Sequence, residues 1–144
     1  MTTPNILLVD DEVPFVETMI KRLDKRGISA MSANSGEEAL IQLGHHKGLE
    51  AIVLDVKMPG MDGIETLKEI KKRYPLTEVI MLTGHATVET AIEGMKLGAF
   101  DYLMKPCELD ALIAKVREAV KKKHDHDLKI EKANIDKLML TRGY

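Results

Sequence analysis

The sequence predicts an α/β protein in which five parallel strands form one sheet with helices on both of its faces. Short apolar segments, typical of buried strands, alternate five times with segments whose apolar residues recur at helical spacing. Strands separated by helices form parallel βαβ units, and right-handed crossovers distribute the helices over both faces. The third apolar segment, residues 51–54, runs directly into Asp55 and then into turn residues. The carboxyl edge of the sheet is therefore the expected place for a site.

The first half of the chain predicts three strands and two helices. Residues 5–9 and 28–33 are the first two strands, and the central third strand follows a polar loop. Between the first two strands, Pro14 suits the opening turn of a helix, because a missing N–H loses no partner there. Ser35 and Glu38 have the spacing of a capping box, which predicts the start of a second helix.

The second half of the chain predicts two more strands, over residues 79–82 and 100–104. It also predicts three helices, from apolar residues at helical spacing: Ile64, Leu67 and Ile70 in the third, Val88, Ala91, Ile92 and Met95 in the fourth, and Leu109, Leu112, Ile113, Val116 and Val120 in the fifth. The third helix must end before Pro75, and Gly98 closes the fourth.

The pattern predicts one folded domain over residues 1–121, followed by a charged extension or linker over residues 122–144, which we expect to be helical. The extension has only a weak apolar stripe, formed by Leu128, Ile135 and Leu138. Three alternatives stay open for it: it prolongs the fifth helix, forms a helix of its own, or frays.

Composition argues against several classes of protein. The formal net charge is −2, and aromatic residues are scarce, so neither a basic field nor base stacking favours nucleic acid. Cys107 is the only cysteine, which rules out an internal disulfide and fits a cytoplasmic location; we interpret it as a small buried residue. The first apolar run is too short for a secretory signal or a membrane span. We therefore expect neither direct nucleic-acid binding nor a membrane partner.

Four of the five strands end in residues capable of chemistry: Asp10 with Asp11, Asp55, Thr83 and Lys105. In a parallel sheet these ends lie on one edge. Three carboxylates there would repel one another unless a cation intervenes, and a small set of oxygen ligands suits Mg²⁺. Lys105 adds a positive charge and Thr83 a hydroxyl group. We interpret the edge as a site for phosphoryl transfer to the carboxylate of Asp55.

Each of these residues also has a simpler explanation. An acid at the end of a strand is usually a helix cap or a solvated loop residue, and Asp11 could cap the first helix. Thr83 alone would be an ordinary strand residue, and Lys105 alone an ordinary surface lysine. Because all of them are expected on one edge, the functional interpretation is favoured.

At four motifs the sequence resembles the receiver domain of two-component response regulators. The motifs are ILLVDDE, IVLDVKMPGMDG, MLTGHA and DYLMKP, in the order and spacing of that family. The resemblance covers about residues 4–121, and residues 83–106 particularly resemble receivers of enhancer-binding transcription activators. It implies a flavodoxin-like, doubly wound sheet with strand order 2-1-3-4-5.

The resemblance also implies roles for the predicted site. Asp55 would accept a phosphoryl group from a phosphohistidine of a sensor histidine kinase or a phosphotransfer protein. Asp11 and Asp55 would bind Mg²⁺ directly together with the backbone carbonyl of Lys57, and Asp10 would act mainly through water.

The remaining implied roles concern switching. Lys105 would pair with the phosphoryl group and would be joined to Pro106 by a cis peptide bond. Thr83 would be the switch hydroxyl, and Tyr102 the aromatic partner that turns inward. The face formed by the fourth helix, fifth strand and fifth helix would then bind a downstream protein, and a homodimer is a further partner to consider.

Two other functions compete with this interpretation. A Mg²⁺-dependent phosphohydrolase of the haloacid-dehalogenase type would need a second acid two residues after Asp55, where this chain has Lys57. A nucleotide-binding module would need a glycine-rich phosphate loop, which is absent from the sequence. The sequence leaves open whether a receiver of this kind stands alone or is part of a larger regulator. A metal site at His124 and His126 is disfavoured, because residues two apart diverge on a helix.

Overall fold

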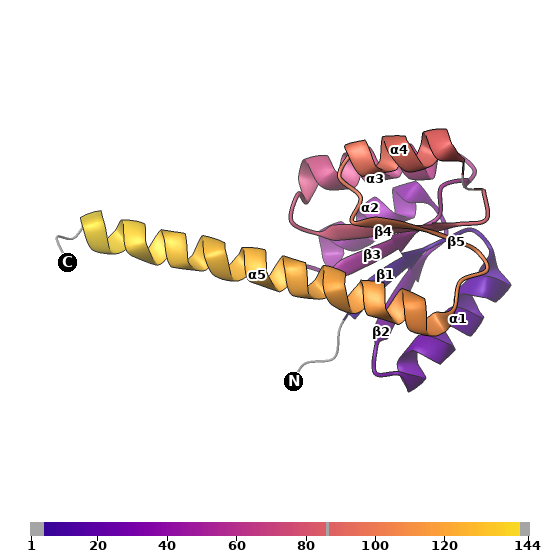
Figure 1. Ribbon diagram of the computed structural model, residues 1–144, viewed down its shortest axis with the longest axis horizontal. Coiled ribbons are helices and arrows are strands. Elements are labelled where there is room, and N and C mark those ends of the chain that lie inside the picture. The colour runs from indigo at the N-terminus through magenta and orange to yellow at the C-terminus, as the bar shows by residue number, and fades with distance from the viewer. Residues whose placement is uncertain (1–4, 86, 142–144) are drawn as a thin grey trace.

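The computed structural model describes residues 5–85 and 87–141, which form a three-layered α/β domain with one long projecting helix (Figure 1). The elements are β1 (Asn5–Val9), α1 (Val13–Lys25), β2 (Ser29–Ala33), α2 (Gly36–His45), β3 (Ala51–Leu54), α3 (Gly63–Arg73), β4 (Glu78–Thr83), α4 (Val88–Lys96), β5 (Asp101–Met104) and α5 (Leu109–Thr141). All strand pairs are parallel, and the order is β2-β1-β3-β4-β5, which confirms the predicted sheet. Strand bounds differ from the predicted ones by a single residue at most.

The core lies on both faces of the sheet, because alternate residues of each strand point to opposite sides. On one face, Leu8, Val53 and Leu82 pack against the apolar sides of α1 and α5. On the other, Leu7, Leu54 and their neighbours pack against α2, α3 and the segment that follows α4. Each fully buried Leu or Ile contributes about 1.5–3 kcal/mol to folding, so the two layers fix the positions of the strand ends.

The fourth helix forms as predicted, but its apolar stripe faces solvent. Val88 is 72% exposed, Ile92 50% and Met95 47%. The face turned toward the sheet is built instead from small or partly buried residues, among them Gly94, which is the buried residue of this helix. Periodicity located the helix correctly, whereas the packed side was set by the neighbouring strand.

The fifth helix continues without interruption to Thr141, so the extension prolongs it (Figure 1). At the point where the helix leaves the domain, two acids at the amino edge of the sheet hold it. The Lys122 Nζ lies 3.2 Å from the Glu78 Oε2, and the His124 Nε2 lies 2.5 Å from the Glu50 Oε2. Because Glu50 and Glu78 precede or begin neighbouring strands, the direction of the extension is tied to the sheet itself.

Within residues 5–85 and 87–141, the structure contains no helix that combines the length and the apolar character needed to cross a bilayer.

A glycine substitution tests how tightly the loop after β3 is packed. A Cβ at Gly63 would lie 2.2 Å from the Asp55 carbonyl oxygen and 2.5 Å from the Val56 Cα. Because backbone atoms cannot move aside as a flexible side chain can, we expect Gly63→Ala to lower the free energy of unfolding by about 3 kcal/mol or more. Urea denaturation measures this loss.

Gly44→Ala is the matched control. The new Cβ would lie 3.8 Å from the Tyr74 hydroxyl, an ordinary contact, on an exposed position of α2. This variant should gain about 0.4–1 kcal/mol, since alanine restricts the unfolded chain and favours helix. Equal losses in the two variants would contradict the packing argument.

Candidate functional site

The strand order brings the predicted residues to one edge of the sheet. Asp10 follows β1 and Asp55 follows β3, the two central neighbours, and the Asp55 N–H donates to the Val9 carbonyl at 2.9 Å. On the other side of β3, Thr83 ends β4, and its carbonyl accepts a hydrogen bond of 2.9 Å from the Lys105 N–H. These backbone contacts fix the start of each side chain within a few ångströms of the next.

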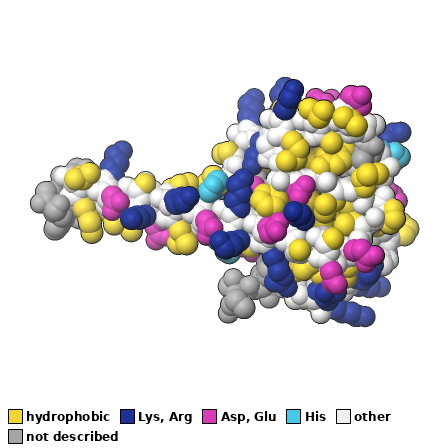
Figure 2. All heavy atoms as spheres, in the orientation of Figure 1, with side chains coloured by type: hydrophobic (Ala, Val, Ile, Leu, Met, Phe, Trp, Pro, Cys, Tyr) yellow, Lys and Arg dark blue, Asp and Glu magenta, His cyan; other side chains and the backbone are white. Residues whose placement is uncertain are grey.

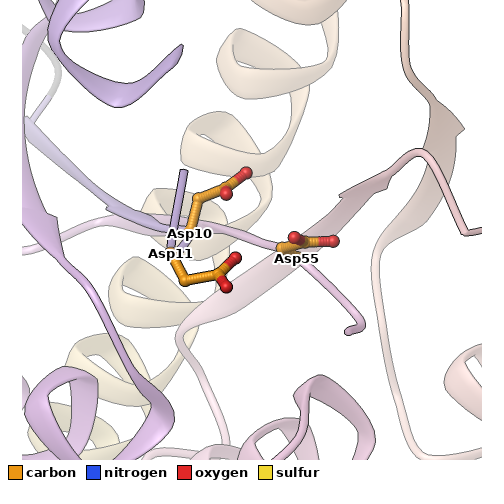
Figure 3. A group of neighbouring side chains, drawn as sticks. All are labelled: Asp10, Asp11 and Asp55. Atoms are coloured by element: carbon orange, nitrogen blue, oxygen red, sulfur yellow. The ribbon is translucent and has the colours of Figure 1, made fainter. Parts of the chain in front are cut away.

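Three carboxylates form one cluster where β1 and β3 end (Figure 3). Oxygens of Asp10, Asp11 and Asp55 all lie within 4.8 Å of one another. Asp10 is 1% exposed and Asp55 is 2% exposed, whereas Asp11 is open to solvent. In the described part of the chain, this is the one group of three such side chains close enough to hold a metal ion.

The Lys105 ammonium is the cation that contacts this cluster. Its Nζ lies 2.6 Å from the Asp10 Oδ2, 3.1 Å from the Glu12 Oε1 and 4.0 Å from the Asp55 Oδ2. The same ammonium sits 4.1 Å from the centre of the Phe15 ring. The sequence reasoning missed Glu12 and Phe15, although Glu12 belongs to the ILLVDDE motif and Phe15 is one of only two phenylalanines.

Burial, hydrogen bonds and nearby charges shift the pKa values of Asp10 and Lys105. Burial raises the pKa of Asp10 above its ordinary value, and the nearby Asp55 adds to this effect, against hydrogen bonds from Lys105 and the Glu12 N–H. For Lys105, burial acts to lower the pKa, but hydrogen bonds to Asp10 and Glu12 outweigh it, so the pKa is raised. Lys105 is therefore charged throughout the physiological range.

The Asp55 carboxylate is short of partners. Its Oδ1 atom is buried without a hydrogen-bond donor among the described residues, and Lys105 is too far from Oδ2 for a hydrogen bond. A buried carboxylate oxygen in this condition is costly unless a cation or a bonded group completes it. Beside it opens a cavity of about 480 Å³, lined by Asp11, Glu12, Asp55, Lys57, Met58, Pro59 and His85.

The oxygen-only cluster, the orphaned oxygen and the adjoining cavity together fit a hydrated Mg²⁺ ion, which binds few carboxylates and keeps several waters. Lys57, whose backbone carbonyl is a predicted ligand, lines the same cavity. Asp11 does not cap α1, which starts after Glu12 with no side-chain cap. The simpler explanation of Asp11 as a helix cap is therefore wrong.

Thr83 and Tyr102, the predicted switch pair, lie outside the carboxylate cluster. The Thr83 side chain is fully buried, and its Oγ1 accepts a hydrogen bond of 3.0 Å from the His85 N–H. Tyr102 is half-buried beneath α4, with its hydroxyl 2.9 Å from the Thr90 Oγ1. The Lys105–Pro106 bond is cis, as the resemblance implied.

Cys107 and His124 lie outside the carboxylate cluster. Cys107 is half-buried at the rim of the core rather than fully buried, because it lies in the loop just before α5; burial raises the pKa of its thiol. The His124 side chain contacts the Glu50 carboxylate.

Comparison with known proteins adds independent evidence. The model of the response regulator receiver domain family matches residues 6–117. The transcriptional regulatory protein ZraR of Escherichia coli is 40% identical over 123 residues, which span 85% of this chain and 28% of ZraR. A putative NtrX-like response regulator of Rickettsia felis is 35% identical over 147 aligned residues, or 99% of this chain and 31% of that protein.

A solved structure gives the same result. The response regulator receiver domain protein from Clostridium thermocellum superposes with a TM-score of 0.80 at 34% identity, over 84% of this chain and 97% of that one. The present chain spans about three tenths of the length of its curated relatives. The resemblance noted from the four motifs is thus confirmed, and the chain belongs to the response regulator receiver domain family of two-component systems.

Proposed function

We propose that this receiver takes a phosphoryl group on Asp55 from the phosphohistidine of a sensor histidine kinase or a phosphotransfer protein. The observation that carries the proposal is the Asp55 carboxylate itself, which has an unpartnered oxygen and lines an open cavity. In the transfer, a carboxylate oxygen attacks phosphorus, the bond between phosphorus and the imidazole nitrogen breaks, and the imidazole leaves with that electron pair. It leaves as the neutral ring, because its other nitrogen carries a proton. Atoms and charge balance without a further reactant.

The residues that would hold Mg²⁺ are Asp11 and Asp55, with the backbone carbonyl of Lys57, while Asp10 acts through water. When bound, the ion supplies the positive charge that the acidic cluster and the phosphoryl oxygens require. The oxygen-only cluster and the size of the cavity support this assignment.

Lys105 would hold the phosphoryl group once it is attached. Its ammonium is kept beside Asp55 by Asp10 and Glu12, so a short movement of its flexible stem is enough to reach a phosphoryl oxygen. Thr83 would donate its hydroxyl hydrogen to another oxygen, and Tyr102 would follow by packing inward. The added charge thereby shifts the population between two packings of the domain.

The output would be a protein contact on the face formed by α4, β5 and α5. This face carries the exposed residues Val88, Ile92 and Met95, together with Met104 on β5. Figure 2 shows hydrophobic side chains gathered over α4. An exposed apolar patch of this kind favours a partner protein.

A second copy of the chain is a further candidate partner, because α5 exposes Leu128, Ile135 and Leu138 beyond the domain. We place the receiver within residues 1–121 and treat residues 122–144 as the extension. The absence of direct nucleic-acid contacts by this chain, and its cytoplasmic location, stay predictions.

The proposal is tested by intact mass after incubation with acetyl phosphate, with and without Mg²⁺. We expect the parent to gain one base-labile phosphoryl group that depends on Mg²⁺, and Asp55→Asn to gain none. Asp62→Asn is the matched control: Asp62 caps α3 close by, and asparagine caps a helix equally well. An Asp55→Asn protein that is modified as well as the parent would overturn the assignment. Rapid turnover of acetyl phosphate without an adduct would favour the phosphohydrolase instead.

Removal of the Lys105 ammonium should separate modification from switching. We expect Lys105→Ala to accept the phosphoryl group from acetyl phosphate, since Asp55 and the acidic cluster stay in place. The equilibrium constant between the two packings of the phosphorylated domain, however, should fall by about tenfold or more, as the loss of a charged hydrogen bond implies. The change in NMR chemical shifts of Tyr102 and α4 on phosphorylation should therefore be smaller than in the parent. Shifts equal to those of the parent would show that Lys105 does not couple the two events.

The raised pKa of Asp10 predicts the effect of neutralising it. A carboxyl group whose folded pKa lies above its ordinary value of 3.8 stabilises the fold below that value. This contribution is lost as pH rises through the folded pKa. At pH 7 in EDTA, Asp10→Asn should therefore unfold at a higher temperature than the parent, by a few degrees, in differential scanning fluorimetry.

Mg²⁺ provides the internal control for this experiment. The ion should raise the unfolding temperature of the parent, because it binds the folded state only. The unfolding temperature of Asp10→Asn should rise less, so that the difference between the two proteins narrows or reverses at millimolar Mg²⁺. A variant that is less stable than the parent in EDTA would show that the ion pair with Lys105 outweighs the cost of burying Asp10.

A further inference from the structure

The hydroxyl group of Thr90, in the first turn of α4, lies at a junction between two elements. Its Oγ1 atom is 3.0 Å from the Thr87 N, 3.0 Å from the Thr87 Oγ1 and 3.1 Å from the Thr87 carbonyl oxygen. It also lies 2.9 Å from the Tyr102 hydroxyl on β5. The helix cap and the aromatic side chain beneath the helix thus share one oxygen atom.

The bonding capacity of a hydroxyl shows why this junction is saturated. A threonine oxygen has one hydrogen to donate and two lone pairs that accept. The Thr87 N–H must be the donor in its bond and so occupies one lone pair. When the Thr90 hydrogen goes to the Thr87 carbonyl, one lone pair is left for two hydroxyl groups, those of Tyr102 at 2.9 Å and Thr87 at 3.0 Å. The junction is therefore fully used, and the Tyr102 O–H is the closer donor to its last position.

The ring of Tyr102 lies directly beneath Gly94 of α4. A Cβ at Gly94 would lie 3.7 Å from the Tyr102 Cδ2 and 3.8 Å from the Met81 Cγ, so the helix backbone covers both side chains closely. Gly94 is four residues after Thr90, which is one helical turn. The hydroxyl of a ring lying under Gly94 therefore meets the preceding turn of the same helix.

The first turn of α4 depends on the same hydrogen bonds. The Thr87 side chain accepts from the Thr90 N–H at 3.1 Å, and the Thr87 carbonyl accepts from the Ala91 N–H at 3.0 Å. Val88, the most exposed apolar residue of the helix, lies inside this turn. A change at Thr90 would consequently reach the apolar surface of α4.

We propose that Thr90 is a positioning residue that passes the position of the Tyr102 side chain to the first turn of α4. The inference rests on the proposed function in treating Tyr102 as the residue that moves on phosphorylation. While the ring lies beneath α4, its hydroxyl stabilises the Thr87–Thr90 cap. When the ring moves, the cap loses one of its bonds and the turn that carries Val88 opens more often.

The test is amide hydrogen exchange at Thr90 and Ala91 in the unphosphorylated chain. The variants are Tyr102→Phe, which keeps the ring, Thr90→Val, which keeps the shape, and the double variant. Tyr102→Phe should speed exchange about threefold to tenfold, the equivalent of one net hydrogen bond. Thr90→Val should speed it at least as much, because it also removes the bonds to Thr87. The double variant should exchange no faster than Thr90→Val, because the two residues act through one bond.

Thr90→Ser is the matched control, since it keeps the hydroxyl group and should exchange as the parent does. A purely structural cap would give a different pattern. Exchange unchanged by Tyr102→Phe, or single effects that multiply in the double variant, would overturn the proposal. Tyr102→Phe keeps it falsifiable even if Thr90→Val weakens the helix on its own.

A second arm separates this inference from the proposed function. After incubation with acetyl phosphate and Mg²⁺, exchange at Thr90 and Ala91 should change in the parent. In Thr90→Val, the phosphoryl group should be gained, as intact mass shows, without that change. An equal response in the two proteins would overturn the role of Thr90. Absence of any adduct on the parent would refute the proposed function alone, since the exchange experiment above does not depend on it.

Discussion

The partly buried ion pair between Lys105 and Asp10 is the shortest charged contact at the carboxyl edge of the sheet. Lys105 follows the last strand and Asp10 the first, so their contact of 2.6 Å joins the side of the sheet that carries α4 to the strand beside Asp55. Three acids, Asp10, Glu12 and Asp55, lie within 4.0 Å of the Lys105 ammonium, and its two hydrogen bonds go to Asp10 and Glu12. Asp55 lies farther from the ammonium, keeps a buried oxygen without a hydrogen-bond donor, and lines the cavity together with Asp11 and Glu12. The negative charge with the fewest partners is therefore that of the Asp55 carboxylate, where the proposed function needs a cation and a phosphoryl group.

The fold supplies this geometry through backbone contacts rather than through the acidic side chains. The register of β1 and β3 sets Val9 opposite Leu54, so the two acids that follow leave the sheet at the same level. The next loop is then pressed against the Asp55 peptide by Gly63, whose N–H donates to the Val56 carbonyl at 2.6 Å. The carboxylates repel one another, but burial of the apolar layers on either side of the strands stabilises the fold and offsets this repulsion.

The sequence allowed the strand ends to be predicted, and with them the cluster of Asp10, Asp55 and Lys105, because apolar runs mark buried strands. It did not reveal Glu12 and Phe15 as partners of Lys105, since neither spacing nor composition specifies which side chains meet across 90 residues. Helical periodicity also predicted the fourth helix without showing that Val88 faces solvent. A stripe of apolar residues has the same period whether it packs on a sheet or awaits a partner.

The two edges of the sheet contact opposite ends of the part of α5 that lies on the domain. This limits how a change at Asp55 could reach the extension. At the amino edge, Glu50 and Glu78 hold the turn of α5 that contains Lys122 and His124. At the carboxyl edge, Lys105 begins the loop that leads into the same helix. Between these points the buried side of α5 packs against the core, so under the proposed function we expect the helix to shift as one unit. Under the proposed function we therefore expect local rearrangement in α4, whose apolar outer face is exposed and whose buried residue is Gly94.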